Sequence, residues 1–181
     1  MKSIQSKDLN LSKKKILIRL DLNVPLNGKK IVDTNRIDKI IPTLKYLLKN
    51  NANIIILSHV GRPKGEVVNE LSLEPVREDL IRKLNQKITL VKQNINKIKV
   101  EDFFNKDCNI IMLENLRFYK EEENNDTNFA RSLAKLADIY INEAFSCSHR
   151  KHASVNSITK FLPSYSGIQF ELEVNSLKKI T

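Results

Sequence analysis

The sequence has few glycines, and their spacing excludes the two commonest phosphate-binding loops. The chain of 181 residues contains four glycines. Neither G-x-G-x-x-G nor G-x-x-x-x-G-K-[ST] can be traced through Gly28, Gly61, Gly65 and Gly167. If the protein uses a nucleotide, we therefore expect that nucleotide to bind elsewhere, with no cofactor bound within this chain.

Cysteines and long apolar runs are also scarce. Cys108 and Cys147 are the only cysteines, which fits a reducing cytosol better than a disulfide scaffold. No apolar run is long enough to cross a membrane, and residues 1–15 lack the apolar segment of a signal peptide. We expect a cytoplasmic protein with no membrane partner, in which Cys108 is buried and Cys147 lies in a polar loop.

Acidic residues are outnumbered by basic ones. The chain has 31 Lys and Arg against 21 Asp and Glu, a formal net charge of +10. Such a balance favours an anionic partner, which could be nucleic acid, a membrane surface or a small phosphate. Lysine runs such as residues 13–15 are typical of a solvated surface, as is the acidic run at residues 121–123, so charge alone does not identify the partner.

Short apolar runs alternate with helical patterns along the chain. The runs are rich in Ile and Leu and do not alternate strictly with polar residues, which is typical of strands buried on both faces of a parallel sheet. We predict strands over residues 15–20, 53–57, 87–91, 109–113 and 138–142. We predict helices over residues 37–48, from Ser72 as N-cap with Pro75 in the first turn, from Asp126 or Thr127, and over residues 170–177.

This alternation predicts an α/β fold, namely a doubly wound parallel β-sheet flanked by helices in a Rossmann-like three-layer sandwich. In such a sheet, ligands bind at the carboxyl ends of the strands. Polar residues follow four of the predicted strands: Asp21, Asn23 and then Arg36 after the first, His59 and Arg62 after the second, Asn115 and Arg117 after the fourth, and His149, Arg150 and His152 after the fifth.

These strand ends predict an anion site. Arginine matches carboxylate and phosphate oxygens with two parallel hydrogen bonds, so four arginines suggest a ligand with two anionic ends. Asp21 and Asn23, two residues apart on an extended segment, point the same way and could accept hydrogen bonds from a hydroxyl between those ends. Taken singly, each residue is more often a surface or loop residue, and only the coincidence at four strand ends favours a site.

Two other kinds of site are disfavoured. Cys147, His149 and His152, with Glu143 nearby, give the spacing C-x-H-x-x-H but lack the second ligand pair of a structural zinc site, so we expect no metal. We expect no nucleic-acid partner, because the arginines follow strands and do not line one helix or an aromatic platform.

Five motifs carry a resemblance to a known family. "RLDLNVP", "TNRI", "LSHVGRPKG", "LENLRFYKEEE" and "HRKHAS" occur in this order and are similar to those of phosphoglycerate kinase, from about Lys15 to the end of the chain. The resemblance implies a two-domain glycolytic enzyme. One domain binds 3-phosphoglycerate or 1,3-bisphosphoglycerate, the other binds Mg-ADP or Mg-ATP, and a hinge closes the two for reversible phosphoryl transfer.

Carried over by motif, the resemblance implies seven substrate ligands: Asp21, Asn23, Arg36, His59, Arg62, Arg117 and Arg150. Among them Arg36 looks like the catalytic residue that stabilises charge on the transferring phosphoryl group. The sequence departs from the family's pattern around this site, with Glu143 where Asp is usual and Ser146, Cys147 and Ser148 in place of a Gly/Thr/Ala-type loop.

The resemblance also implies a domain organisation. We expect residues 1–167 to form the N-terminal substrate-binding α/β domain and residues 168–181 to begin the interdomain helix, with the C-terminal nucleotide-binding domain absent. Such a chain should be a monomer, should partner the missing domain, and should be inactive alone. The alternative is a non-catalytic anion-binding module from a truncated paralogue.

Overall fold

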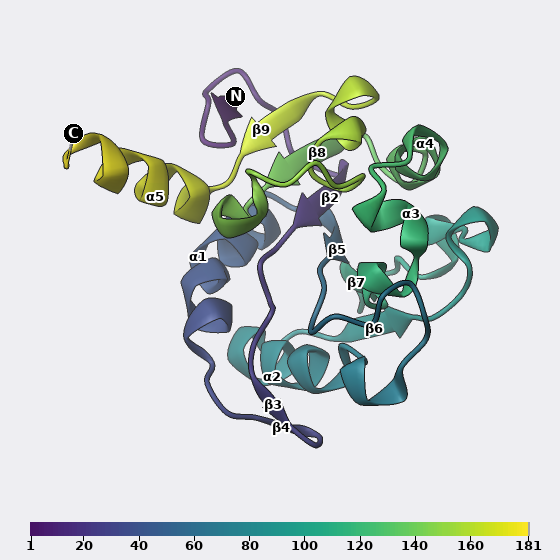
Figure 1. Ribbon diagram of the computed structural model, residues 1–181. Coiled ribbons are helices and arrows are strands. Elements are labelled where there is room, and N and C mark those ends of the chain that lie inside the picture. Colours follow the sequence, from purple (N-terminus) through teal and green to yellow (C-terminus); the bar gives the residue numbers. More distant parts are fainter. Residues whose placement is uncertain (181) are drawn as a thin grey trace.

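A computed structural model describes residues 1–180 as a parallel β-sheet between two layers of helices and turns (Figure 1). The sheet has seven strands in the order β1-β9-β8-β2-β5-β7-β6, and every neighbouring pair is parallel. The strands are β1 (Lys2–Ser3), β2 (Lys15–Arg19), β5 (Asn53–Leu57), β6 (Ile88–Val91), β7 (Ile110–Leu113), β8 (Ile139–Asn142) and β9 (Ser164–Ser166). A separate two-stranded hairpin pairs β3 (Leu26–Asn27) with β4 (Lys30–Ile31).

The helices alternate with the strands along the chain. They are α1 (Asn35–Lys49), α2 (Glu74–Leu84), α3 (Lys120–Glu123), α4 (Thr127–Ala134) and α5 (Ile168–Lys178). Short 3₁₀ turns join them: η1 (Asn69–Leu71), η2 (Ile95–Lys97), η3 (Val100–Asp102), η4 (Leu116–Phe118), η5 (Phe145–Cys147) and η6 (Ser157–Lys160). The predicted α/β architecture and its five strands are confirmed, whereas β1 and β9 are too short to leave an apolar run.

The central strands bury both of their faces, as a parallel sheet requires. Along β5, Ile54 and Ile56 pack into a core shared with α1 and α2, while Ile55 and Leu57 pack into a second core shared with α4. Because α1 and α2 lie on one side of the sheet and α4 on the other (Figure 1), the two cores lie on opposite sides of the sheet. This arrangement explains why the runs show no strict polar alternation.

Of the two predicted helix caps, one is confirmed and one is wrong. Asp126 caps α4 as predicted, its side chain accepting a hydrogen bond of 2.7 Å from the Phe129 amide. Ser72 is not the N-cap of α2, because the helix begins at Glu74 and Leu73 holds the cap position. The Ser72 hydroxyl nevertheless accepts from the Glu74 amide (3.2 Å) at the start of the helix, and the Glu114 carboxylate holds this turn by accepting from the Leu73 amide (2.8 Å) and the Ser72 hydroxyl (2.7 Å).

The strand order places a crevice at one edge of the sheet. The chain leaves β2 for β5 on one side, and only later returns to β8 on the other side of β2. Loops on the two sides of β2 therefore diverge, and the gap between them at the carboxyl ends is where α/β folds bind ligands. Within residues 1–180, no helix is long and apolar enough to span a membrane.

A buried carboxylate fixes the start of α5. Glu143 accepts hydrogen bonds from the amides of Gln169 (3.0 Å) and Phe170 (2.9 Å), in the first turn of α5, and from the Thr43 hydroxyl of α1. Burial raises the pKa of Glu143, and these hydrogen bonds oppose the rise. The same carboxylate thus joins two helices to the carboxyl end of β8.

This junction predicts that Gly167 does not tolerate a side chain. A Cβ at Gly167 would lie 1.9 Å from Glu143 Oε2, so Gly167→Ala should displace the carboxylate and lower the free energy of unfolding by about 1–3 kcal/mol. Urea denaturation measures the loss. The control is Gly28→Asn, where no atom lies within 4 Å and the positive φ suits Asn. Equal stability of Gly167→Ala and the unmodified chain would contradict this account.

Candidate anion-binding site

A cavity of about 180 Å³ opens at the carboxyl ends of β2, β5, β7 and β8. The structure brings all seven residues predicted as ligands around it. Its lining consists of Asp21, Asn23, Arg36, His59, Arg62, Arg117, Ser146, Cys147 and Arg150. Four arginines therefore face a space that contains one carboxylate.

The segment after β2 supplies two oxygen-bearing side chains. Leu22 is buried, so Asp21 and Asn23, on either side of it, turn to the cavity. Asn23 Oδ1 accepts a hydrogen bond of 2.9 Å from the Gly61 amide, which ties this segment to the loop after β5. The side-chain NH₂ group of Asn23 makes no hydrogen bond within residues 1–180 and can donate to a ligand in the cavity.

Asp21 joins three segments at the rim. Its Oδ2 accepts hydrogen bonds from Arg36 in the first turn of α1 and from the Ser146 hydroxyl in η5. Burial alone would raise the pKa of Asp21, but these two hydrogen bonds and the charge of Arg36 outweigh it and hold the pKa below its usual value. Arg36 remains half exposed, with 49% of its side chain open to solvent, and can reach a ligand while paired.

Gly61 shapes the loop that follows β5. Its φ of +65° lies in the left-handed region, and a Cβ there would come within 2.7 Å of the Leu71 side chain. The Gly61 carbonyl accepts a hydrogen bond of 3.2 Å from Arg117 Nη1. The backbone of this one residue therefore contacts both Asn23 and Arg117.

Arg117 is a buried cation with an incomplete set of partners. It is only 4% exposed, and its Nε lies 3.9 Å from Glu123 without making a hydrogen bond. Burial lowers the pKa of Arg117, Glu123 opposes this, and the charges of Arg150 and Arg19 add to the lowering. Asn115 supports the turn, because its side chain accepts from the Arg117 amide and donates to Val60 and Leu71 carbonyls.

His59 enters the site as a neutral group. The ring is 2% exposed, and Nδ1 lies 2.7 Å from Arg19 Nη2. Burial first, and then the charges of Arg19, Arg117, His152 and Arg150, push the pKa of His59 far below its ordinary value. The site therefore combines guanidinium charges with a neutral imidazole.

A buried network behind His59 was not predicted from the sequence. Arg19, at the end of β2, is fully buried and donates to Ser154 Oγ (2.9 Å) and the Leu20 carbonyl (2.5 Å). Ser154 in turn donates to Glu122 through its amide and hydroxyl. The expected solvated face at residues 121–123 is thus wrong for Glu122, which is buried because the segment carrying Ser154 folds over α3.

The remaining cations stand at the mouth of the cavity. Arg62 and Arg150 are exposed, and within residues 1–180 neither side chain makes a hydrogen bond or ion pair. Guanidinium groups that have no protein partner are free to bind an anion. His59 and Arg117, which are held by hydrogen bonds to the protein, and Arg62 and Arg150, which are not, thus line the same cavity.

The other residues singled out after β8 have different surroundings. His149 is exposed and does not line the cavity. His152 is buried, and its Nδ1 has no hydrogen-bond partner within residues 1–180. Cys147 is also buried and not in a polar loop, because it packs with Ala144 and Val155 in a small apolar cluster beside the cavity. Cys108 is buried as predicted.

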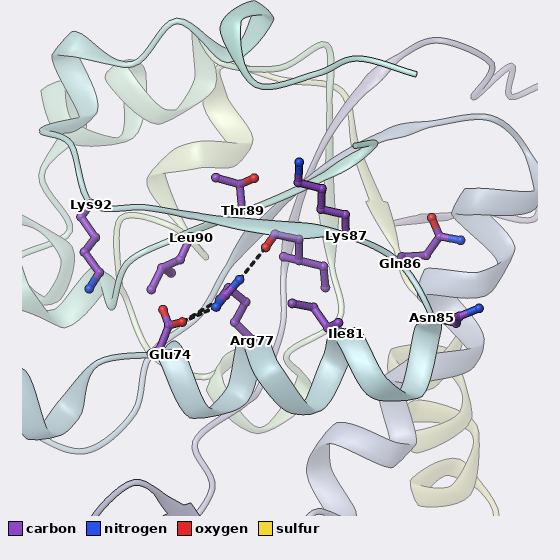
Figure 2. A pocket seen from close by; sticks show the side chains of 10 residues that line it. Glu74, Arg77, Ile81, Asn85, Gln86, Lys87, Thr89, Leu90 and Lys92 are labelled. Carbon is purple, nitrogen blue, oxygen red and sulfur yellow. Dashed lines mark hydrogen bonds and ion pairs between the residues drawn. The ribbon is translucent and has the colours of Figure 1, made fainter. Parts of the chain in front are cut away.

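A larger hollow of about 630 Å³ lies along edge strand β6 and α2, remote from these groups. Figure 2 shows Arg77 there between Glu74 and the backbone of β6. Arg77 is ion-paired with Glu74 and donates 3.0 Å to the Ile88 carbonyl, so its charge is already used within the protein. Lys87 and Lys92 also line this hollow and make no ion pair within residues 1–180, but its one arginine is paired, whereas the smaller cavity has two unpaired arginines, Arg62 and Arg150.

Fold and site together define an α/β domain with a cation-lined anion site at the switch point of its sheet. Comparison with known proteins assigns the chain to a family: it belongs to the phosphoglycerate kinase family, whose profile matches residues 6–181. Its relatives include the phosphoglycerate kinases of Wolbachia pipientis subsp. Culex pipiens (strain wPip), 48% identical over 98% of this chain and 44% of the relative, and of Moorella thermoacetica, 41% identical over 99% and 46%.

Solved structures agree with this assignment. The chain is similar to phosphoglycerate kinase from Coxiella burnetii, with a TM-score of 0.84 and 34% identity over 95% of this chain and 43% of that one. It is also similar to the enzyme from Pyrococcus horikoshii OT3, with a TM-score of 0.86 and 27% identity over 99% and 45%. The chain spans less than half the length of these relatives.

The neutral state of His59 predicts a fall in stability on acidification. Unfolded histidine has a pKa of about 6.5, so below that pH the unfolded chain takes up a proton that buried His59 does not. The free energy of unfolding should therefore be insensitive to His59 above about pH 6.5 and fall by up to about 1.4 kcal/mol per pH unit below it. His152, whose pKa is lowered by burial and then by Arg117, adds to the same trend.

Urea unfolding at about pH 7.5, 6 and 5 measures this slope. His59→Gln serves as the matched variant, because glutamine does not titrate and the slope should become shallower. An identical slope in both proteins would show that His59 does take up a proton in the folded state.

Proposed function

We propose that this chain is the substrate-binding half of a phosphoglycerate kinase. The observation that carries the proposal is the convergence of four arginines on one small cavity with a single carboxylate. 3-Phosphoglycerate has a phosphate at one end, a carboxylate at the other and a hydroxyl between them. Arginines suit both anionic ends, and Asp21 and Asn23 suit the hydroxyl.

The proposed roles follow from where each side chain lies. Asp21, Asn23, His59, Arg62, Arg117 and Arg150 bind and orient the substrate. Arg36 is proposed as the catalytic residue, because it stands half exposed at the rim and can contact a phosphoryl group that passes out of the cavity. Phosphoryl transfer needs alignment and charge stabilisation more than covalent help, which is what guanidinium groups supply.

The reaction of the whole protein is proposed by analogy with the relatives. A phosphoryl group would pass reversibly between 1,3-bisphosphoglycerate and ADP, giving 3-phosphoglycerate and ATP in glycolysis. Mg-ADP or Mg-ATP would bind to a C-terminal domain outside these residues. Residues 1–167 would form the substrate domain and residues 168–181 the start of the interdomain helix, in a monomeric, cytoplasmic enzyme that closes on its substrates and excludes water.

Binding of 3-phosphoglycerate tests the proposal. Arg36→Ala and Arg62→Ala should each weaken binding roughly ten- to hundredfold, because each removes a charge-assisted hydrogen bond to the ligand. Isothermal titration calorimetry measures the affinities. Arg82→Ala is the control, because this substitution removes the same charge from an exposed position on α2, where Arg82 pairs with Asp79. Equal affinities in all four proteins would refute the site.

We also predict that the chain does not turn over alone. Incubated with ATP and 3-phosphoglycerate, it should form no ADP above background, because the nucleotide would bind outside residues 1–181. A full-length relative in the same coupled assay is the positive control. ADP formation that Arg36→Ala abolishes would contradict this prediction. Binding without turnover under every condition, even with a supplied nucleotide domain, would instead favour the non-catalytic anion-binding module.

A further inference from the structure

The hydrogen bond between Arg19 and His59 determines where the imidazole proton lies. A guanidinium group only donates hydrogen bonds and has no acceptor. At 2.7 Å from Arg19 Nη2, Nδ1 of His59 must therefore be the acceptor and carry no proton. A neutral imidazole that accepts at Nδ1 has its proton on Nε2.

The opposite edge of the ring faces the cavity. His59 lines the cavity, and its Nε2 makes no hydrogen bond within residues 1–180. It is also not among the sealed polar atoms that lack a partner, so it is open to the cavity and not enclosed by protein. An Nε2–H at this place is a donor that has no acceptor within residues 1–180 and can donate to a ligand.

Arg19 has no freedom to turn away. All three of its nitrogens are used: Nε donates to Ser154, Nη1 to the Leu20 carbonyl and Nη2 to His59. Ser154 is itself held, because it donates to Glu122 and its carbonyl accepts from the Tyr140 hydroxyl at 2.7 Å. The ring edge that reaches the cavity is thus set by a chain of buried contacts.

We propose that Arg19 is a positioning residue that holds His59 as its Nε2–H tautomer, so that the imidazole serves the anion site as a neutral donor and not as a cation. Arg19 does not line the cavity and acts on the ligand only through His59. The proposal rests on the proposed function for the identity of the ligand, but not for the tautomer.

The surrounding charges agree with this tautomer. Arg19 from β2, Arg117 from η4, and Arg150 and His152 from the segment after η5 all face His59 and disfavour its protonation. Glu122, the buried carboxylate of the network, is separated from His59 by Ser154 and Arg19. A neutral donor adds a hydrogen bond to the ligand without adding a further charge to the four arginines.

Nitrogen NMR of the histidine-labelled chain tests the tautomer without any ligand. His59, identified by the loss of its signal in His59→Gln, should show an unprotonated, hydrogen-bonded Nδ1 and a protonated Nε2 from about pH 5.5 to 8, whereas the urea-unfolded chain titrates near 6.5. In Arg19→Gln, whose amide can donate or accept, the Nδ1–H form should gain population. A protonated Nδ1 in the unmodified folded chain would overturn the proposal.

Two variants of His59 test the donor directly and do not depend on Arg19→Gln folding. Asparagine keeps an acceptor near the position of Nδ1 but has nothing at Nε2, whereas glutamine places an amide nitrogen near Nε2. His59→Asn should weaken binding of 3-phosphoglycerate by roughly tenfold or more, and His59→Gln should weaken it less. The reverse order would overturn the proposal.

The two hypotheses fail differently. If the unmodified chain binds inorganic phosphate but not 3-phosphoglycerate, the proposed function fails, and the same two variants titrated with phosphate still decide the donor. If 3-phosphoglycerate binds but the NMR signals show Nδ1–H, the function stands and the positioning role of Arg19 is wrong.

Discussion

The mutual repulsion of cations gathered at one edge of the sheet is the constraint on which the site depends. Four arginines line a cavity with one carboxylate, and Arg19 lies buried directly behind them. Burial is the main cause of the lowered pKa values of Arg117 and His59, and the charges of neighbouring cations lower both further. The fold has to hold these groups in place without neutralising them.

It does so by anchoring some cations and leaving others open. Arg36 is paired with Asp21, and Arg19 is held through Ser154 beside Glu122. Arg62 and Arg150 have no side-chain partner within residues 1–180. The anchored groups fix the shape of the cavity, and the open ones leave positive charge that only a ligand can satisfy.

The Glu143 junction adds a mechanical link to this arrangement. The carboxylate binds the first turn of α5 and the Thr43 hydroxyl in the middle of α1, and the first turn of α1 carries Arg36. A displacement of α5 would therefore move Glu143 and, through it, α1, the helix that positions Arg36. The chain spans less than half the length of its relatives.

Much of this could be predicted from the sequence, because strand ends in a parallel sheet converge whatever their separation along the chain. From the sequence alone, that rule predicted that Asp21, His59, Arg117 and Arg150 lie close together. It could not identify Arg19, which ends an apolar run like an ordinary flanking charge, or Glu122, which lies within an acidic run typical of a solvated face. Their burial depends on the segment at Ser154 folding over α3, a long-range contact that leaves no local pattern.

The stability of the chain in the presence of 3-phosphoglycerate tests most directly whether unpaired cations determine the properties of the site. The account predicts that 3-phosphoglycerate raises the unfolding midpoint with the logarithm of its concentration, and by more than sodium chloride does at equal ionic strength, since the salt only screens the charges. Equal shifts with both would contradict the account, because repulsion at the cavity would then be relieved by screening alone.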